Sequence, residues 1–135
     1  MFVCTYQGLA FGLRNFQMFS LLFIKSRLKS SQRVTVFSFF DSLTSWEGAA
    51  NKLGLGLEFR KKVKFIFAAD FLLETDWLEE KNSFGRLLDE IEKTAANTDL
   101  LILDGLSIVC SLLEENRSAK NQISHFLQKI ADLER

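Results

Sequence analysis

The chain has 135 residues, of which 47% are hydrophobic and 25% are charged. This composition excludes a mainly disordered chain, and the length predicts a single domain over residues 1–135. Two cysteines, Cys4 and Cys110, are too few for the disulfide framework of a small secreted scaffold. We therefore expect a protein of a reducing compartment.

The charges are divided unevenly along the chain, although lysine plus arginine and aspartate plus glutamate are equal at 17 each. Residues 1–64 carry ten basic and three acidic residues, whereas residues 65–135 carry seven basic and fourteen acidic ones. Such a division can serve a nucleic acid or head-to-tail docking of like-folded subunits. It can equally scatter over the surface once the chain is folded, and both interpretations stay open.

Nothing near the start of the sequence predicts a membrane span or a signal peptide. Residues 16–24 form an apolar stretch of roughly half the ~20 residues that a bilayer requires. Residues 1–13 carry no charge, and Lys25, Arg27 and Lys29 follow the apolar stretch instead of preceding it. We expect no membrane partner, and we expect the fourteen phenylalanines to be buried in a core or in a subunit contact.

Apolar residues at helical spacing predict four helices. In the first, Phe16, Phe19 and Phe23 share a face, and basic residues follow at the carboxyl end, where they offset the helix dipole. The second begins with hydroxyl side chains suited to capping and ends at Gly54. The predicted helices span residues 16–29, 45–53, 83–96 and 118–133.

Short apolar runs predict three strands, at residues 33–40, 62–69 and 100–103. Asp104 and Gly105 end the last run, which is typical of a buried parallel strand that leads into a loop. The alternation of helices and strands predicts an α/β fold with a mainly parallel sheet. Three consecutive basic residues stand in the predicted loop before the second strand, where they are candidates for a nucleic-acid or partner patch: Arg60, Lys61 and Lys62.

Asp104 is the most suggestive single residue, because nucleoside triphosphatases hold magnesium with a carboxylate at the end of a buried parallel strand. The matching phosphate loop, which ends in Gly-Lys-Ser/Thr, is missing. The nearest glycine-containing segment, residues 8–14, has the wrong spacing and ends in Arg14. This disfavours nucleotide hydrolysis, and the main alternative is that Asp104 caps the turn at Gly105 and Leu106.

The remaining candidates for chemistry are weak. Asp41, Asp70 and Asp104 all follow predicted strands and could together hold a metal in a small α/β enzyme, although acidic residues also begin ordinary loops. His125 is the one histidine and has no carboxylate partner that the sequence identifies. One histidine and two distant cysteines exclude a structural zinc site. We assign no catalytic residue, no metal ligand and no cofactor.

Four blocks of the sequence, taken in order, resemble one family. They are residues 33–46, in which a strand enters a Ser-Leu-Thr-Ser-Trp turn; residues 51–57, Asn-Lys-Leu-Gly-Leu-Gly-Leu; residues 65–67, Phe-Ile-Phe; and residues 101–109, Leu-Ile-Leu-Asp-Gly-Leu-Ser-Ile-Val. Their order and spacing, over about residues 16–113, are similar to the sixth subunit of the Elongator complex. That family is RecA-like and lacks a working nucleotide site.

The resemblance implies a three-layer RecA-like domain that is incomplete at both ends. Members of the family begin with a further strand and a degenerate phosphate loop, for which residues 1–14 are an atypical or poorly ordered substitute. They also continue beyond a helix like the one predicted at residues 118–133. An incomplete sheet needs partners to cover its edge.

The resemblance also implies a function. The chain would be a non-catalytic member of a six-membered ring, built with the fourth and fifth Elongator subunits in the cytoplasm or nucleus. The ring supports wobble-uridine modification of transfer RNA, and the assembled ring as a whole contacts that RNA. The alternative is a fragment of a RecA-like NTPase or helicase whose phosphate loop is missing, because Leu-Asp-X-Leu-Ser also occurs in RecA-like helicases.

Overall fold

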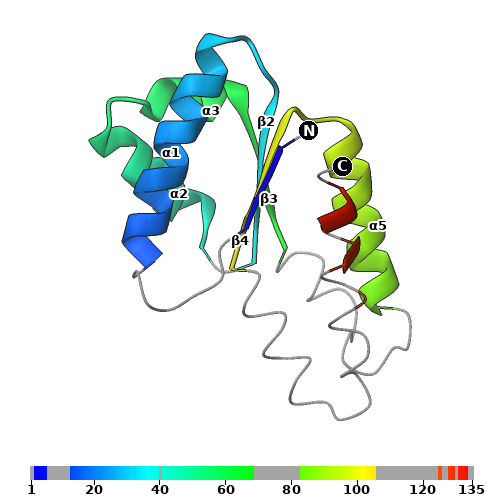
Figure 1. Ribbon diagram of the computed structural model, residues 1–135. Helices are drawn as coiled ribbons and strands as arrows, with labels where there is room; N and C mark the ends of the chain where they lie inside the picture. Colours follow the sequence, from blue (N-terminus) through cyan, green and yellow to red (C-terminus); the bar gives the residue numbers. More distant parts are fainter. Residues whose placement is uncertain are drawn as a thin grey trace.

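Four parallel strands form the centre of the computed structural model, which describes residues 2–5, 13–39, 41–68, 83–105, 125, 128–129 and 131–133 (Figure 1). In spatial order the strands are β1 (Phe2–Thr5), β4 (Leu100–Asp104), β2 (Val34–Ser38) and β3 (Val63–Phe67). Every residue of β2 and β4 is buried, as expected for strands that are covered on both faces. The predicted α/β class and the parallel sheet are confirmed.

Helices cover both faces of this sheet. Figure 1 shows α1 (Leu13–Lys29), α2 (Leu43–Lys52) and α3 (Gly56–Lys62) on one side and α5 (Ser83–Ala96) on the other. Two apolar clusters fill the spaces between the layers, and alternate residues of each central strand enter one cluster or the other. On β4, for example, Ile102 packs with the α1 to α3 layer and Leu103 packs with α5.

The local sequence explains most of these elements. The side chain of Ser42 accepts a hydrogen bond from the Ser45 backbone N–H over 3.2 Å and so caps the start of α2. Gly54 follows the end of α2 with a φ of 71°, in the left-handed region that glycine adopts most readily. Helix α5 has the predicted bounds, because its apolar residues repeat at helical spacing over its whole length.

Two predictions about local structure are wrong. Arg60, Lys61 and Lys62 form the last turn of α3 instead of a loop, and β3 begins one residue later than predicted, at Val63. Within residues 1–14, for which an atypical or poorly ordered start stays a prediction, the structure describes strand β1, which pairs in parallel with β4. Helix α1 also begins in this stretch, at Leu13.

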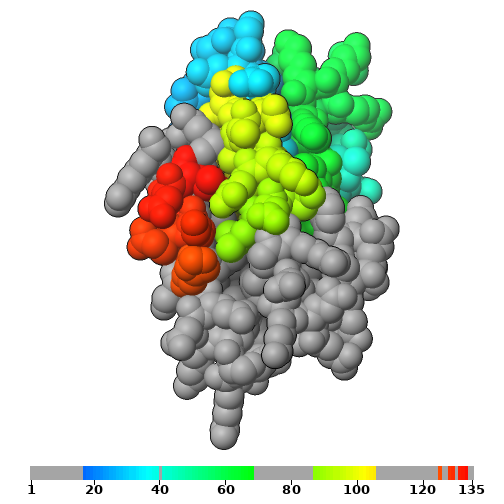
Figure 2. All heavy atoms as spheres, turned by 90° about the vertical axis from the view of Figure 1, so that its right-hand side faces the viewer, coloured from blue at the N-terminus to red at the C-terminus, as the bar shows by residue number. Residues whose placement is uncertain are grey.

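The predicted helix at residues 118–133 lies mostly outside the described residues. Residues 125, 128–129 and 131–132 are helical, and Figures 1 and 2 both place the end of the chain beside α5. Leu133 packs against the apolar cluster that α5 covers. Among the helices that the structure describes, none is both long and apolar enough to cross a membrane.

Candidate functional site

The main polar site lies where β2 and β4 end. The parallel register places Ser38 and Asp104, the last residues of the two strands, side by side. Ser38 Oγ lies 2.9 Å from Asp104 Oδ2, and the indole Nε1 of Trp46, on α2, donates to the same oxygen over 3.1 Å. All three side chains are fully buried. One oxygen of the Asp104 carboxylate therefore accepts hydrogen bonds from two other elements of the fold, β2 and α2.

A second carboxylate joins this network through Ser38. The backbone N–H of Asp41 donates to Ser38 Oγ over 3.0 Å, and Ser38 Oγ also lies 2.8 Å from the Asp41 carbonyl oxygen. Gln17, a buried residue of α1, donates from Nε2 to Asp41 Oδ2 over 2.9 Å and lies 3.0 Å from Ser45 Oγ. The network thus joins α1, the start of α2 and the ends of both central strands.

Burial dominates the electrostatics of both carboxyl groups. It raises the pKa of Asp104, although the hydrogen bonds from Ser38 and Trp46 act in the opposite direction, and the nearby charge of Asp41 raises it further. Burial also raises the pKa of Asp41, against a hydrogen bond with Ser45 that lowers it. Asp104 Oδ1 is buried and has no hydrogen-bond partner among the described residues, so these residues compensate the charged form of Asp104 only in part.

This geometry does not make Asp104 available to a magnesium ion. The side chain has no exposed surface, and its Oδ2 already accepts from Ser38 and Trp46. No three histidine, cysteine, aspartate or glutamate side chains lie close enough together to hold a metal within the part of the chain that the structure describes. Asp70 lies outside that part, so the structure brings together only Asp41 and Asp104 of the three predicted carboxylates.

The partners of Asp104 also differ from those of a turn cap. Ser38 and Trp46 are 66 and 58 positions away in the sequence, so these two bonds tie together two strands and a helix. Leu106 lies outside the described residues. The roles of Ser38, Trp46 and Gln17 were not predicted from the sequence. The signal that marks Ser38 is a hydroxyl at the last position of a fully buried strand.

The predicted basic patch lies at the opposite end of the sheet from Asp104. Arg60, Lys61 and Lys62 are all exposed, and Arg60 lies 3.5 Å from a Glu47 carboxylate oxygen on α2. They precede β3 directly, so they stand at the amino end of the strands, whereas Asp104 stands at the carboxyl end. The two predicted features therefore form separate sites.

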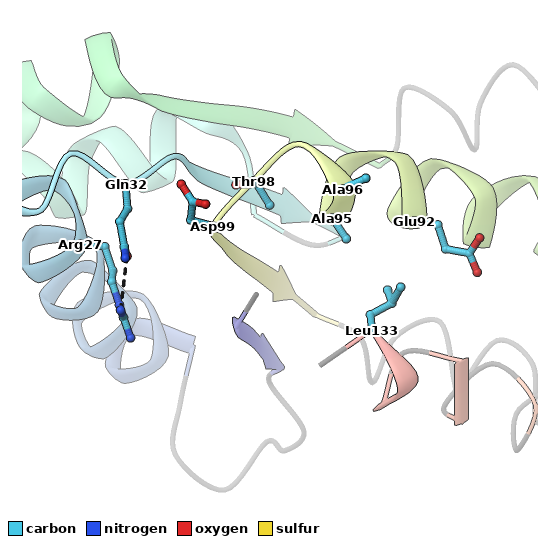
Figure 3. A pocket seen from close by; sticks show the side chains of 8 residues that line it. All are labelled: Arg27, Gln32, Glu92, Ala95, Ala96, Thr98, Asp99 and Leu133. Atoms are coloured by element: carbon cyan, nitrogen blue, oxygen red, sulfur yellow. Dashed lines mark hydrogen bonds between the residues drawn. The ribbon is translucent and has the colours of Figure 1, made fainter. Parts of the chain in front are cut away.

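A cavity of about 630 Å³ opens at the amino end of the sheet, between α1 and α5 (Figure 3). Arg27 and Gln32 lie on one side of it, joined by a hydrogen bond of 3.3 Å, and Leu133 lies on the other. Asp99 and Glu92 contribute acidic groups to the lining. Thr98 Oγ1 is bonded to the backbone carbonyls of Arg33 and Leu100, and Asp99 is paired with Arg33, so these groups are held by the fold and give the cavity no evident chemistry.

Searches of protein-family models, curated proteins and solved structures return no match to this chain. The geometry of the carboxyl-end network and the motifs of the sequence are therefore the basis for a functional hypothesis. The resemblance to the sixth Elongator subunit stays a prediction.

Proposed function

We propose that this chain is a non-catalytic RecA-like subunit of an Elongator-type ring, with the fourth and fifth Elongator subunits as partners. In this role it supports wobble-uridine modification of transfer RNA in the cytoplasm or nucleus and has no enzymatic activity of its own. The order of the four sequence blocks supports the proposal. So does the parallel sheet with helices on both faces, which is compatible with part of a RecA-like domain.

The burial of Asp104 is the observation that carries the non-catalytic part of the proposal. In an NTPase the carboxylate at this point must reach a magnesium ion that a nucleotide holds. Here Asp104 is closed off, and its Oδ2 is bonded to Ser38 and Trp46. A carboxylate in this arrangement stabilises the junction of β2, β4 and α2 and presents no exposed surface to a ligand.

The order of β1 and α1 gives further support. In NTPases the phosphate loop stands between a strand and the helix that follows it, and β1 and α1 are such a pair along this chain. The sequence between them, residues 6–12, contains Gly8 and Gly12, but no lysine and no hydroxyl of a Gly-Lys-Ser/Thr motif follows them. β1 is also the neighbour of β4, which ends in Asp104. A sequence between β1 and α1 that lacks the phosphate-binding residues is consistent with an assembly subunit.

The second candidate is a fragment of a RecA-like NTPase whose phosphate loop is missing. Asp104 Oδ1 favours it, because this buried acceptor has no donor among the residues that the structure describes, and such an acceptor is costly unless a ligand or a proton compensates it. Co-purification with ring subunits and ATP hydrolysis distinguish the two candidates.

We expect co-expression with the fourth and fifth Elongator subunits to change the solution behaviour of the chain. In the part of the chain whose side chains the structure describes, four large apolar side chains are exposed: Phe19, Leu22, Leu43 and Leu57. Such residues favour self-association until a partner covers them. Light scattering should show aggregates for the chain alone, whereas affinity purification of the tagged chain from the co-expression should yield a soluble complex of all three proteins.

The matched control is co-expression with an unrelated soluble protein, which should leave the chain aggregated. A chain that is a monodisperse monomer alone, and that retains neither ring subunit on the affinity column, would contradict the proposed assembly role.

A further inference from the structure

The carboxyl ends of two helices and the amino ends of two strands meet at one edge of the sheet. Lys29 is the last residue of α1 and Lys62 is the last residue of α3. Val34 and Val63 are partners in the parallel pairing of β2 and β3, so the residues that precede them, Arg33 and Lys62, lie on neighbouring strand starts. We name the exposed side chains gathered here the basic rim: Lys29, Arg33, Lys61 and Lys62.

The positive charge at the rim exceeds what the helices require. A helix C-terminus carries about half a negative charge, so α1 and α3 together offer about one. The last turn of α1 contains Arg27 and Lys29, and that of α3 contains three further basic residues. Compensation of the helix dipoles therefore accounts for only a small part of this charge.

Few of the rim charges are neutralised by neighbouring carboxylates. Arg33 forms an exposed ion pair of 3.3 Å with Asp99. Lys29, Lys61 and Lys62 have no carboxylate within ion-pair distance among the residues that the structure describes. Their charges are available to an anionic partner.

The turn between α1 and β2 adds neutral hydrogen-bonding groups to the rim. Ser30 and Ser31 are exposed, and Gln32 is partly exposed. Serine hydroxyls and glutamine amides, together with lysine and arginine, are the side chains that contact phosphate oxygens in protein–nucleic acid complexes. Residues 29–33 therefore present five consecutive side chains of types that contact phosphates.

The rim has few of the apolar side chains that a membrane surface or a protein partner requires. Three of the four large exposed apolar side chains of the described residues, Phe19, Leu22 and Leu43, lie away from the strand starts. Leu57, one turn before Lys61 on α3, is the single large apolar side chain of this set beside the rim. A membrane-surface site places apolar side chains beside its basic ones, and a protein interface has an apolar or aromatic centre depleted in lysine. A phosphate backbone needs only the charges and the donors.

We propose that the basic rim binds the phosphate backbone of RNA without reading its sequence. The choice of RNA over DNA rests on the proposed function, whereas the recognition of phosphates rests on the geometry alone. Asp99, paired with Arg33, marks the limit of the surface on the side of β4. The surface therefore runs from α1 across the start of β2 to α3.

Fluorescence anisotropy with a labelled oligouridylate tests this surface on the full chain. The test variant is Lys29→Glu with Lys62→Glu. The matched control is Lys93→Glu with Lys129→Glu, which changes the net charge equally at two exposed lysines away from the rim. We expect the rim variant to bind at least about tenfold more weakly, with a salt slope flatter by about 0.7 for each phosphate that it no longer neutralises. The control should bind like the wild type.

Thermal melting by circular dichroism checks that each variant is folded, and Lys29→Gln with Lys62→Gln replaces a rim variant that fails to fold. The inference is overturned if the wild type does not bind the oligouridylate, or if the rim and control variants lose affinity equally. It is also overturned if the rim variant loses binding only to phosphatidylserine vesicles. Tighter binding to an oligodeoxyuridylate would overturn the choice of RNA. Co-purification with the ring subunits can succeed in each case, so failure here is distinct from failure of the proposed function.

Discussion

Trp46→Ala is expected to lower the free energy of unfolding by about 3–5 kcal/mol, the usual effect of removing a large buried aromatic side chain. The indole of Trp46 has no exposed surface and stacks on the Phe59 ring of α3, with 6.2 Å between the ring centroids. It also donates a hydrogen bond to Asp104. The variant therefore loses a packed aromatic pair and a donor to a buried carboxylate. Urea denaturation followed by circular dichroism measures the change.

Trp46→Phe is the control that separates packing from hydrogen bonding. Phenylalanine keeps an aromatic ring against Phe59 but has no N–H for Asp104 Oδ2, which retains Ser38. We expect a loss of about 1–2 kcal/mol, the range of one hydrogen bond to a buried polar or charged group. A loss below about 1 kcal/mol for Trp46→Ala, which is usual for surface positions, would contradict the position of the indole in the core.

Asp104→Asn and Asp104→Ala are expected to change the free energy of unfolding at neutral pH in opposite directions or by clearly different amounts. The asparagine carbonyl can accept from both Ser38 and Trp46, and the substitution removes a buried charge, so the free energy of unfolding should stay constant or rise. Alanine leaves both donors without an acceptor, and we expect a loss of about 1–3 kcal/mol. Urea denaturation of the two variants beside the wild type measures both effects. If Asp104→Asn lowers the free energy of unfolding as much as Asp104→Ala does, residue 104 must do more than accept these two hydrogen bonds, which would contradict its structural role.

The difference in stability between the wild type and Asp104→Asn reports the titration of Asp104 together with its coupling to Asp41, because Asp99 and the other titrating groups are present in both proteins. Burial raises the pKa of Asp104 above its ordinary value of 3.8. Between that value and the raised one, the folded state binds more protons than the unfolded state, so the free energy of unfolding falls as the pH rises. Relative to the variant, the wild type should therefore gain stability on acidification. A stability difference between the wild type and Asp104→Asn that does not change with pH would contradict the burial of the Asp104 carboxylate.

Strong local patterns in the sequence predict the central elements of the fold. The apolar runs of β2 and β4 and the repeating apolar face of α5 each mark their element, because each is long or uniform enough to exclude other structures. β1 was missed because its residues, Phe-Val-Cys-Thr, are less uniformly apolar than the Leu-Leu-Ile-Leu run of β4. α3 was missed because no side chain caps its start at Leu55, and its last turn consists of Arg60, Lys61 and Lys62, which is also typical of a loop.

The candidate site was predicted only in part, because its contacts are distant in sequence. Asp41 and Asp104 could be placed at strand ends, where polar groups of α/β proteins gather. The bonds that define the role of Asp104 come from Ser38 and Trp46, and they depend on the strand register and on the packing of α2. Neither the strand register nor the packing of α2 can be taken from a local sequence pattern. The placement of Arg33 and Lys62 at neighbouring strand starts depends in the same way on the pairing of β2 with β3.

Magnesium-dependent ATP hydrolysis by the purified chain tests the non-catalytic role most directly. The assay compares the wild type with Asp104→Asn, in preparations freed of contaminating ATPases. The buried Asp104 and the missing phosphate-loop residues predict no turnover above background in either protein. Magnesium-dependent turnover in the wild type that Asp104→Asn abolishes would contradict the account and would identify the chain as part of an active NTPase.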